Sequence, residues 1–383
     1  MKHAALLALA LPLLAVTACG SAPARVSVTA APAVTAPLAT SLVTNQGSWA
    51  IVVMGGSAAS EDNFWELFVQ PAGASRWSLV TPPGVADNGG IVAAGSPASL
   101  LAGFLPSQDL AFSPLADSTS TGKSWTPGLL DAPLANAPDA LSTLPGSTAP
   151  GSTAPAGRVL ALLANQAIEA GSATGPWSEL TTLKALAASA AGRECGLVKV
   201  TTISFWTNGS PIAAGECARP GVAGVFRDTD GTWEAAGPAL PAAYAGDLVQ
   251  VLRLNGETAL LRAGPDLLVA WYAGTQWRLS PPIADAGQLT ASGFGVNRVT
   301  WVLAGRRATA VAGPGAPLLV LPEVPAGTAV LVPSPGTAGP GYAKAGYEAL
   351  AVSGSRLTVW RLEGNTWTKV QVINVPIQYG SSS

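Results

Sequence analysis

Histidine is almost absent from this chain of 383 residues. The only one is His3, which lies in a segment with the features of a removable export signal. A Ser-His-Asp triad, a Cys-His pair and a zinc site with imidazole ligands all require histidine. We therefore exclude these sites from the mature protein, and most hydrolase chemistries with them. We assign no catalytic residue and favour a protein that is not an enzyme.

Charged residues are also scarce. They make up 11% of the chain, with a formal net charge of -2, whereas a typical globular protein has about 25%. Without a basic field, nucleic acid is excluded as a partner. The acidic pairs Glu61-Asp62 and Asp228/Asp230 offer too few oxygen ligands for calcium, and we interpret them as solvated turns. No metal site and no cofactor are predicted.

Cysteine occurs only three times, and the first copy marks an export signal. Lys2 and His3 provide a basic start, and residues 4–15 form an apolar stretch too short to span a bilayer. The segment ends in Val16-Thr17-Ala18-Cys19, which resembles the lipobox of bacterial lipoproteins. The resemblance implies a signal peptide over 1–18, with a diacylglycerol and fatty acids such as palmitate on Cys19. The alternative is an ordinary cleaved signal in which Cys19 is there by chance.

The expected location is therefore the cell membrane, lipid-anchored on the extracytoplasmic face. The membrane partner would be reached through Cys19. The composition, rich in Ala, Gly, Pro and Thr, resembles that of proteins from high-GC actinobacteria.

The other two cysteines, Cys195 and Cys217, are 22 residues apart around an Asn208-Gly209 turn signal. Exported proteins mature in an oxidising compartment, so we predict one structural disulfide. The two residues would not lie opposite each other in a regular hairpin, which requires a bulge or a longer turn. A redox-active pair is not favoured, because the spacing is not C-x-x-C.

Six tight turns that end in tryptophan define a repeat. They end at Trp77, Trp125, Trp177, Trp233, Trp277 and Trp367. The average spacing is about 48 residues, and Gly315-Ala-Pro-Leu318 fills the one double gap as a degenerate copy. This period is in the range of a β-propeller blade. We predict an all-β propeller of seven blades with four antiparallel strands each, with six or eight blades as open alternatives.

The strand pattern of one blade is clearest at residues 247–280, where Asn255-Gly256 is a type I′ hairpin signal. Apolar runs at 50–54, 267–272, 299–304 and 317–322 suit strands that are covered on both faces. The repeated tryptophan is expected to open the fourth strand and to pack between neighbouring blades as a structural residue.

The remaining segments fix the domain limits. Residues 19–40 are interpreted as an Ala/Pro/Thr-rich tether and 41–380 as a single propeller domain. Residues 141–157 form a predicted low-complexity loop between the second and third blades. It is either a surface insertion, which we favour, or a carrier of O-glycans on Thr148 and Thr153. Residues 178–193 are predicted to form one short amphipathic helix.

Residues 118–125, Ser-Thr-Ser-Thr-Gly-Lys-Ser-Trp, resemble the Asp-box of sialidase-type propellers, with serine at 120 where that family has aspartate. The turn Asp228–Trp233 resembles it more loosely. In that family the motif closes the turn between the third and fourth strands and is structural. The family's catalytic segments are not found, and its Tyr/Glu pair has one counterpart, Tyr347-Glu348.

Three functions stay open at this point. The leading hypothesis is a non-enzymatic, monomeric scaffold that binds a protein partner or assists envelope assembly. The second is a module for envelope or extracellular glycan, which predicts accessible aromatic side chains, with Trp65, Trp206 and Trp360 as candidates. The third is a sialidase-like glycoside hydrolase, which requires two carboxylates about 5–10 Å apart in the central depression.

Overall fold

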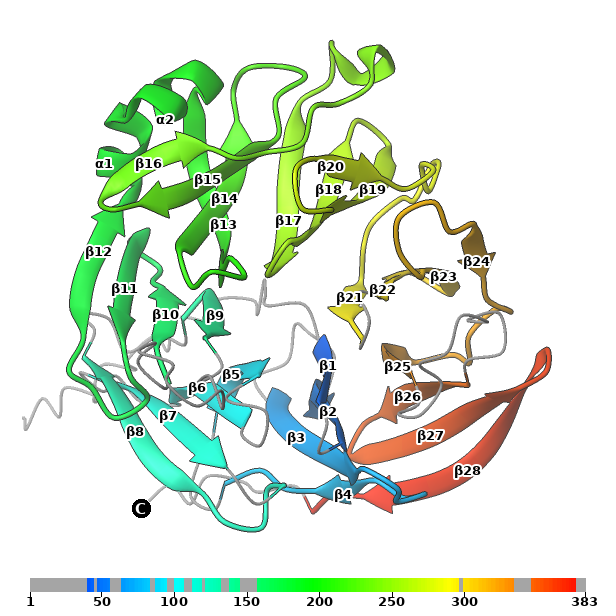
Figure 1. Cartoon of the computed structure of the whole chain (residues 1–383). Helices are drawn as coiled ribbons and strands as arrows, with labels where there is room; N and C mark the ends of the chain where they lie inside the picture. Colours follow the sequence, from blue (N-terminus) through cyan, green and yellow to red (C-terminus); the bar gives the residue numbers. More distant parts are fainter. Residues whose placement is uncertain are drawn as a thin grey trace, which may run out of the picture. The chain divides into compact units, whose positions relative to one another are not determined.

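Antiparallel strands dominate the structure, a computed structural model that describes residues 40–44, 47–55, 63–82, 87–94, 100–106, 112–118, 121–131, 138–144, 157–295, 299–333 and 346–376. Within these ranges, the strands β1 to β28 fall in chain order into seven groups of four, numbered here 1 to 7 (Figure 1). In each group, consecutive strands pair antiparallel. The number of blades stays a prediction.

The first four groups occupy the N-terminal half of the described chain. Group 1 comprises β1 (Thr40–Thr44), β2 (Gly47–Gly55), β3 (Asn63–Pro71) and β4 (Ser78–Leu79). Group 2 comprises β5 (Asp87–Ala94), β6 (Leu100–Pro106), β7 (Phe112–Ser118) and β8 (Thr126–Asp131). Group 3 comprises β9 (Ala140–Thr143), β10 (Val159–Leu162), β11 (Ala167–Gly171) and β12 (Ser178–Thr182). Group 4 comprises β13 (Leu197–Phe205), β14 (Pro211–Cys217), β15 (Gly224–Thr229) and β16 (Thr232–Ala235).

The last three groups repeat this pattern. Group 5 comprises β17 (Val249–Asn255), β18 (Thr258–Ala263), β19 (Asp266–Tyr272) and β20 (Trp277–Leu279). Group 6 comprises β21 (Ala291–Phe294), β22 (Thr300–Ala304), β23 (Arg307–Val311) and β24 (Leu318–Val320). Group 7 comprises β25 (Thr328–Pro333), β26 (Tyr347–Ser353), β27 (Arg356–Glu363) and β28 (Thr366–Asn374). A short 3-10 helix, Ala242–Tyr244, lies between groups 4 and 5.

Group 5 matches its predicted strand pattern closely. The hairpin turn falls at Asn255-Gly256, where Gly256 has a φ of +55°. Glycine adopts this left-handed conformation without the steric penalty that a Cβ atom brings. The tight turn therefore sets the register in which Asn255 pairs with Thr258.

The core lies between successive groups. Trp49 and Ile51 of group 1 pack with Leu100 of group 2, and further clusters join groups 2 and 3, 3 and 4, 4 and 5, and 5 and 6. A last cluster joins groups 6 and 7 to group 1, with Trp301 and Leu350 completely buried. Each such side chain contributes about 1.5–3 kcal/mol when fully buried. Packing of sheet against sheet, in an order that returns to the first group, is the packing of a propeller.

The predicted single helix over 178–193 is wrong. Residues 178–182 form β12, and two short helices follow, α1 (Leu183–Ala188) and α2 (Ala190–Cys195). Ser189 ends α1 and starts α2, because its side-chain oxygen accepts from Gly192 N and donates to Leu186 O. This hydroxyl satisfies a backbone group of each helix and so stabilises the break.

Two further expectations need correction. The loop predicted over 141–157 starts later, since Ala140–Thr143 is β9 and pairs with β10, so the remainder lies inside group 3. Residues 145–156, including Thr148 and Thr153, are outside the described residues. The apolar run 317–322 is not a fully covered strand, because it contains the outer strand β24, whose Val320 is 72% exposed.

The predicted signal peptide, the tether before Thr40, Cys19 and the pair Glu61-Asp62 lie outside the described residues. No helix in the described ranges has the length and hydropathy needed to cross a bilayer.

Candidate functional site

The six repeat tryptophans all lie at the start of a fourth strand, as expected. Trp77, Trp125 and Trp177 immediately precede β4, β8 and β12, Trp277 opens β20, and Trp233 and Trp367 are the second residues of β16 and β28. The degenerate copy behaves in the same way, since Leu318 opens β24. None of the six is exposed, which is consistent with a structural role.

Three of these tryptophans share a hydrogen bond that the sequence pattern did not reveal. In each, the indole N–H donates to a backbone carbonyl just after the fourth strand of the preceding group. The bonds run from Trp125 to Val80 (3.0 Å), from Trp277 to Ala236 (2.7 Å) and from Trp367 to Pro322 (3.3 Å). Tryptophan therefore both fills the space between groups and satisfies a carbonyl that has left its strand.

Trp77 departs from this pattern, because it lies where group 1 meets group 7. Its indole N–H donates to Glu348 Oε2 at 2.6 Å. The other oxygen of Glu348 accepts from Arg361 Nε at 3.0 Å and from Nη2 at 2.7 Å. The Glu348 side chain is only 2% exposed. The carboxylate is thus held by an arginine fork on one side and by an indole on the other.

Gln371 adds a second attachment between the same two groups. Its side-chain oxygen accepts from Trp77 N and its amide donates to Trp77 O, both at 2.8 Å. A bulge makes this contact geometrically available. Gln371 pairs with Val359 and Lys369 with Trp360, so Val370 is an extra residue that moves Gln371 to the face of Arg361.

We call Trp77, Glu348, Arg361 and Gln371 the closing contact. Glu348 of the Tyr347-Glu348 sequence, the counterpart of a sialidase pair, belongs to it. Both residues lie in β26 and are buried, and Glu348 is already bound by two structural partners. The hydrolase alternative gains no support from this pair.

The turns that resemble an Asp-box lie between third and fourth strands, as the resemblance implies. Gly122, with a φ of +76°, donates to Ser118 Oγ at 2.9 Å before β8. Gly231 donates to Asp228 Oδ1 at 2.8 Å before β16. Asp228 thus serves the turn itself. Among the described residues, no cluster of three potential metal ligands occurs.

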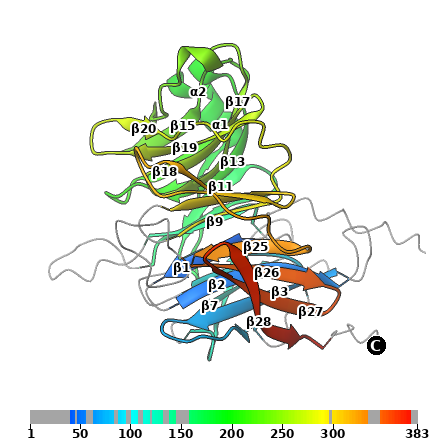
Figure 2. The same ribbon diagram turned by 90° about the vertical axis from the view of Figure 1, so that its right-hand side faces the viewer.

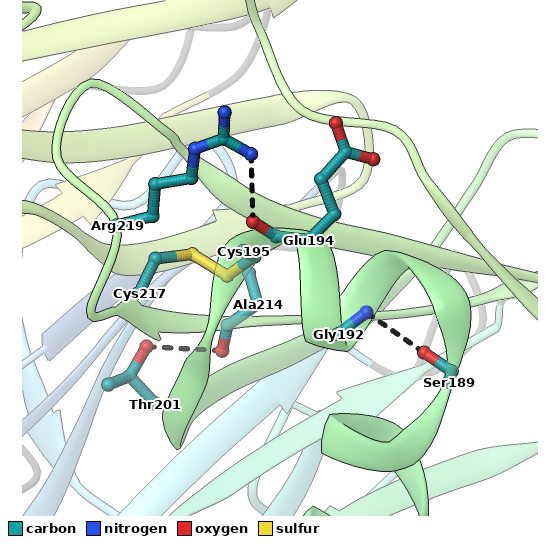
Figure 3. The surroundings of a disulfide bond; sticks show 8 residues. All are labelled: Ser189, Gly192, Glu194, Cys195, Thr201, Ala214, Cys217 and Arg219. Carbon is teal, nitrogen blue, oxygen red and sulfur yellow. Dashed lines mark hydrogen bonds between the residues drawn. A yellow bond between two sulfur atoms is a disulfide. The ribbon is translucent and has the colours of Figure 1, made fainter.

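The structure joins Cys195 and Cys217 in a disulfide (Figure 3). Cys195 ends α2 and Cys217 ends β14, and two register shifts in β13 supply the predicted irregularity. Gly224 leaves room for the bond, since a Cβ there would lie 2.6 Å from Cys217 Sγ. The disulfide therefore attaches the helical pair to the sheet of group 4.

Two of the three tryptophans named for glycan stacking are buried, and none is fully exposed. Trp65 is 4% and Trp206 is 5% exposed, and Trp360 is half-buried. Trp206 packs edge-to-face with Tyr272 and Trp277, with ring centroids 4.7 and 5.9 Å away. Rings this close leave no space for a sugar between them. All twelve tryptophans are buried or half-buried.

The innermost strands are joined to their neighbours by polar side chains. Ser41 of β1 donates to Leu331 O of β25 at 2.6 Å, and Ser204 of β13 accepts from Gly256 N at 2.8 Å. Arg253 of β17 donates from Nη1 to Ser292 O of β21 at 2.7 Å. Burial lowers the pKa of Arg253 to about 10.

One outer surface also stands out. Only six large apolar residues are exposed among those described, and three of them belong to the outer strands of the two groups that the closing contact joins: Leu79, Val370 and Val372. Gln371 separates the two valines and holds the backbone of Trp77, two residues from Leu79. These three residues are called the seam surface below. They belong to β4 (Figure 1) and to β28 (Figures 1 and 2), the outer strands of groups 1 and 7.

Comparison with known proteins identifies the fold. A protein from Lactobacillus plantarum aligns over 86% of this chain and 97% of its own, with a TM-score of 0.52 and 9% identity. The fold is a β-propeller. A candidate 6-phosphogluconolactonase from Bacteroides uniformis aligns over 87% of this chain and 98% of its own, with a TM-score of 0.50 and 10% identity. At these identities, the propeller likeness shows architecture and no activity.

No family model and no curated protein matches the sequence. The hydrolase alternative placed a site in the central depression but named no residue there. A lone arginine in a strand gives no sequence signal, and the partners of Glu348 lie up to 271 residues away in the chain.

Proposed function

We propose that this protein is a lipid-anchored, extracytoplasmic β-propeller that binds an extended segment of a partner protein and does not act as an enzyme. Anchoring through Cys19 rests on the lipobox resemblance. The observation that carries partner binding is the seam surface. Val370 is 38% and Val372 is 44% exposed, and Leu79 is 37% exposed.

The strand that bears the two valines suits such a partner. β28 has nine residues, whereas the outer strands β4, β8, β12, β16, β20 and β24 have between two and six. It is the last strand of its sheet, and no further strand pairs with it among the described residues. An open strand edge with apolar side chains can accept an added strand from another chain.

The local charge specifies the partner further. Lys369 is exposed in β28 next to Val370. An extended segment with β-branched apolar residues and an acidic residue opposite Lys369 would match this strand. Lys369 also disfavours pairing of β28 with a second copy of itself, because the two like charges would repel each other, which agrees with the predicted monomer.

The proposal separates into two measurements. For the anchor, the mass of the mature protein from its own membrane is compared with that of a Cys19→Ala variant. We expect the native chain to begin at Cys19 with covalent lipid and the variant to leave the membrane fraction. A native chain without lipid would refute anchoring through Cys19.

For the partner, a photo-crosslinking amino acid is placed at Val372, and in a matched control at Val320. Both valines are exposed on outer strands. We expect a crosslink from position 372 to one extended segment of one protein, and binding of that purified protein that Val372→Asp abolishes and Val320→Asp retains. Equal crosslinking at both positions, or binding insensitive to Val372→Asp, would contradict the proposal.

A further inference from the structure

Arg253 combines burial of its charge with the lack of a paired carboxylate in the described part of the chain. Arg361 is paired with Glu348, and Arg306 is paired with Glu323 at 3.0 Å. Arg227 lies over the Trp206 ring at 5.6 Å. Among the described residues, Arg253 has one partner, the carbonyl of Ser292, and no carboxylate is paired with it.

The position of Arg253 is fixed by the strand register. A bulge at Leu252 makes Arg253 pair with Leu260, whose side chain belongs to the cluster between groups 5 and 6. Side chains opposite each other in a sheet share a face, so Arg253 also points toward group 6. There its Nη1 reaches Ser292 in β21, the innermost strand of that group.

An arginine in this position is costly to the folded chain. Burying a cation without a counter-charge removes hydration that one carbonyl only partly replaces. The lowered pKa of Arg253 has desolvation as its cause, with no opposite charge to offset it. Arg253, taken as a whole residue, is half-buried.

The face of group 6 near Arg253 is polar but incompletely bonded. Ser292 Oγ and Thr300 Oγ1 are buried, and neither has a hydrogen-bond partner among the described residues. Ser292 pairs with Val302, which packs in the cluster between groups 5 and 6, and Thr300 is two residues before Val302 in β22. By alternation, both hydroxyls are on the side of β21 and β22 that faces Arg253.

We propose that Arg253 is the anchor of a binding site for a small oxyanion, a carboxylate or a phosphate group, at the innermost strands between groups 5 and 6. A guanidinium has five N–H donors in a planar fork that matches two oxygens of such an anion. One donor is used by Ser292 O, which orients the group, and the remaining donors face the ligand. The anion supplies the counter-charge that the described protein residues do not provide.

The test uses the purified folded chain with inorganic phosphate and with acetate as probes, each at constant ionic strength set by chloride. Calorimetry measures binding to the native chain, to Arg253→Gln and to Arg253→Lys. The matched control is Arg262→Gln, because Arg262 is also in group 5 and also donates to a backbone carbonyl, that of Gly287, at 2.8 Å. Circular dichroism verifies that each variant is folded.

We expect saturable binding of at least one probe to the native chain and to Arg262→Gln, and at least tenfold weaker binding to Arg253→Gln. Arg253→Lys is expected to bind with intermediate affinity, since it keeps the charge but loses the fork. The choice between phosphate and acetate identifies the class of oxyanion.

A second readout does not depend on a stable variant. Phenylglyoxal modifies accessible arginines, and peptide mass spectrometry locates the adducts. The bound oxyanion should protect Arg253 at least fivefold and leave the modification of Arg262 unchanged. Equal protection of both arginines, or no binding of either probe to the native chain, would overturn the proposal.

Discussion

Replacing Arg361 by methionine tests the closing contact directly. The change leaves Glu348, whose side chain is 2% exposed, with the Trp77 indole as its remaining hydrogen-bond partner among the described residues. Removing one partner of a buried ion pair costs about 3–5 kcal/mol. The Arg361 side chain is 33% exposed, so water partly solvates the carboxylate once the arginine is gone. We therefore expect the free energy of unfolding to fall by about 3 kcal/mol, the lower end of this range.

The assay is equilibrium unfolding in urea, followed by tryptophan fluorescence and by circular dichroism. A control variant, Arg306→Met, removes an ion pair in which both side chains are more than half exposed. Its free energy of unfolding should fall by less than about 1 kcal/mol.

A double-mutant cycle with Glu348→Gln then isolates the pair. The double variant contains no unpaired buried charge. Its decrease in the free energy of unfolding should therefore be smaller, by about 1–2 kcal/mol, than the sum of the decreases in the two single variants. If Arg361→Met loses no more than Arg306→Met, or if the two single losses simply add, the assignment of the closing contact as a coupled buried pair is refuted.

Three further predictions concern the rest of the fold. Replacing Cys195 and Cys217 by serine should lower the unfolding free energy by about 3 kcal/mol, the value for a 22-residue separation, as measured by urea unfolding; an unchanged midpoint would contradict it. Burial raises the pKa of Glu66, so this carboxyl group binds its proton more tightly in the folded protein than in the unfolded chain. The contribution of Glu66 to the free energy of unfolding therefore falls as the pH rises above 4.5. Glu66→Gln should therefore be more stable than the native chain at about pH 7 and equal to it near pH 4 by thermal unfolding, and an equal difference at both values would argue against this. No indole hydrogen bond of Trp233 is found among the described residues, whereas the Trp125 indole donates to Val80 O. Trp125→Phe should therefore lower the free energy of unfolding by about 1 kcal/mol more than Trp233→Phe, and the reverse order would argue against a stabilising role of the carbonyl bond.

The repeat made the architecture predictable, because one local pattern recurs: a turn, a tryptophan and a short outer strand. Each copy obeys the same steric and hydrophobic constraints, and the place of Trp77, Trp125 or Leu318 follows from them. The disulfide was predictable from the cysteine count, since the predicted lipidation of Cys19 would leave a single possible pairing.

Long-range contacts were not predictable in this way. Glu348 meets Trp77 only because the first and last groups are neighbours in space, and no local pattern encodes a partner 271 residues away. The unpaired state of Arg253 likewise depends on which residues other strands bring near it. The division into two helices at Ser189 was missed, because apolar periodicity does not record that one hydroxyl can serve two helix ends.

The closing contact also determines how freely the chain's connectivity can be changed. Groups 1 and 7 are each built from consecutive strands, and in the part of the chain that the structure describes they exchange none. Side chains and packing, not a shared strand, hold the first group to the last. The order in which the seven groups are covalently linked is therefore separable from the order in which they pack. A circular permutant that joins residue 376 to residue 40 by a flexible linker, and that opens between groups 4 and 5, should fold to the same propeller with its ends moved to the opposite side.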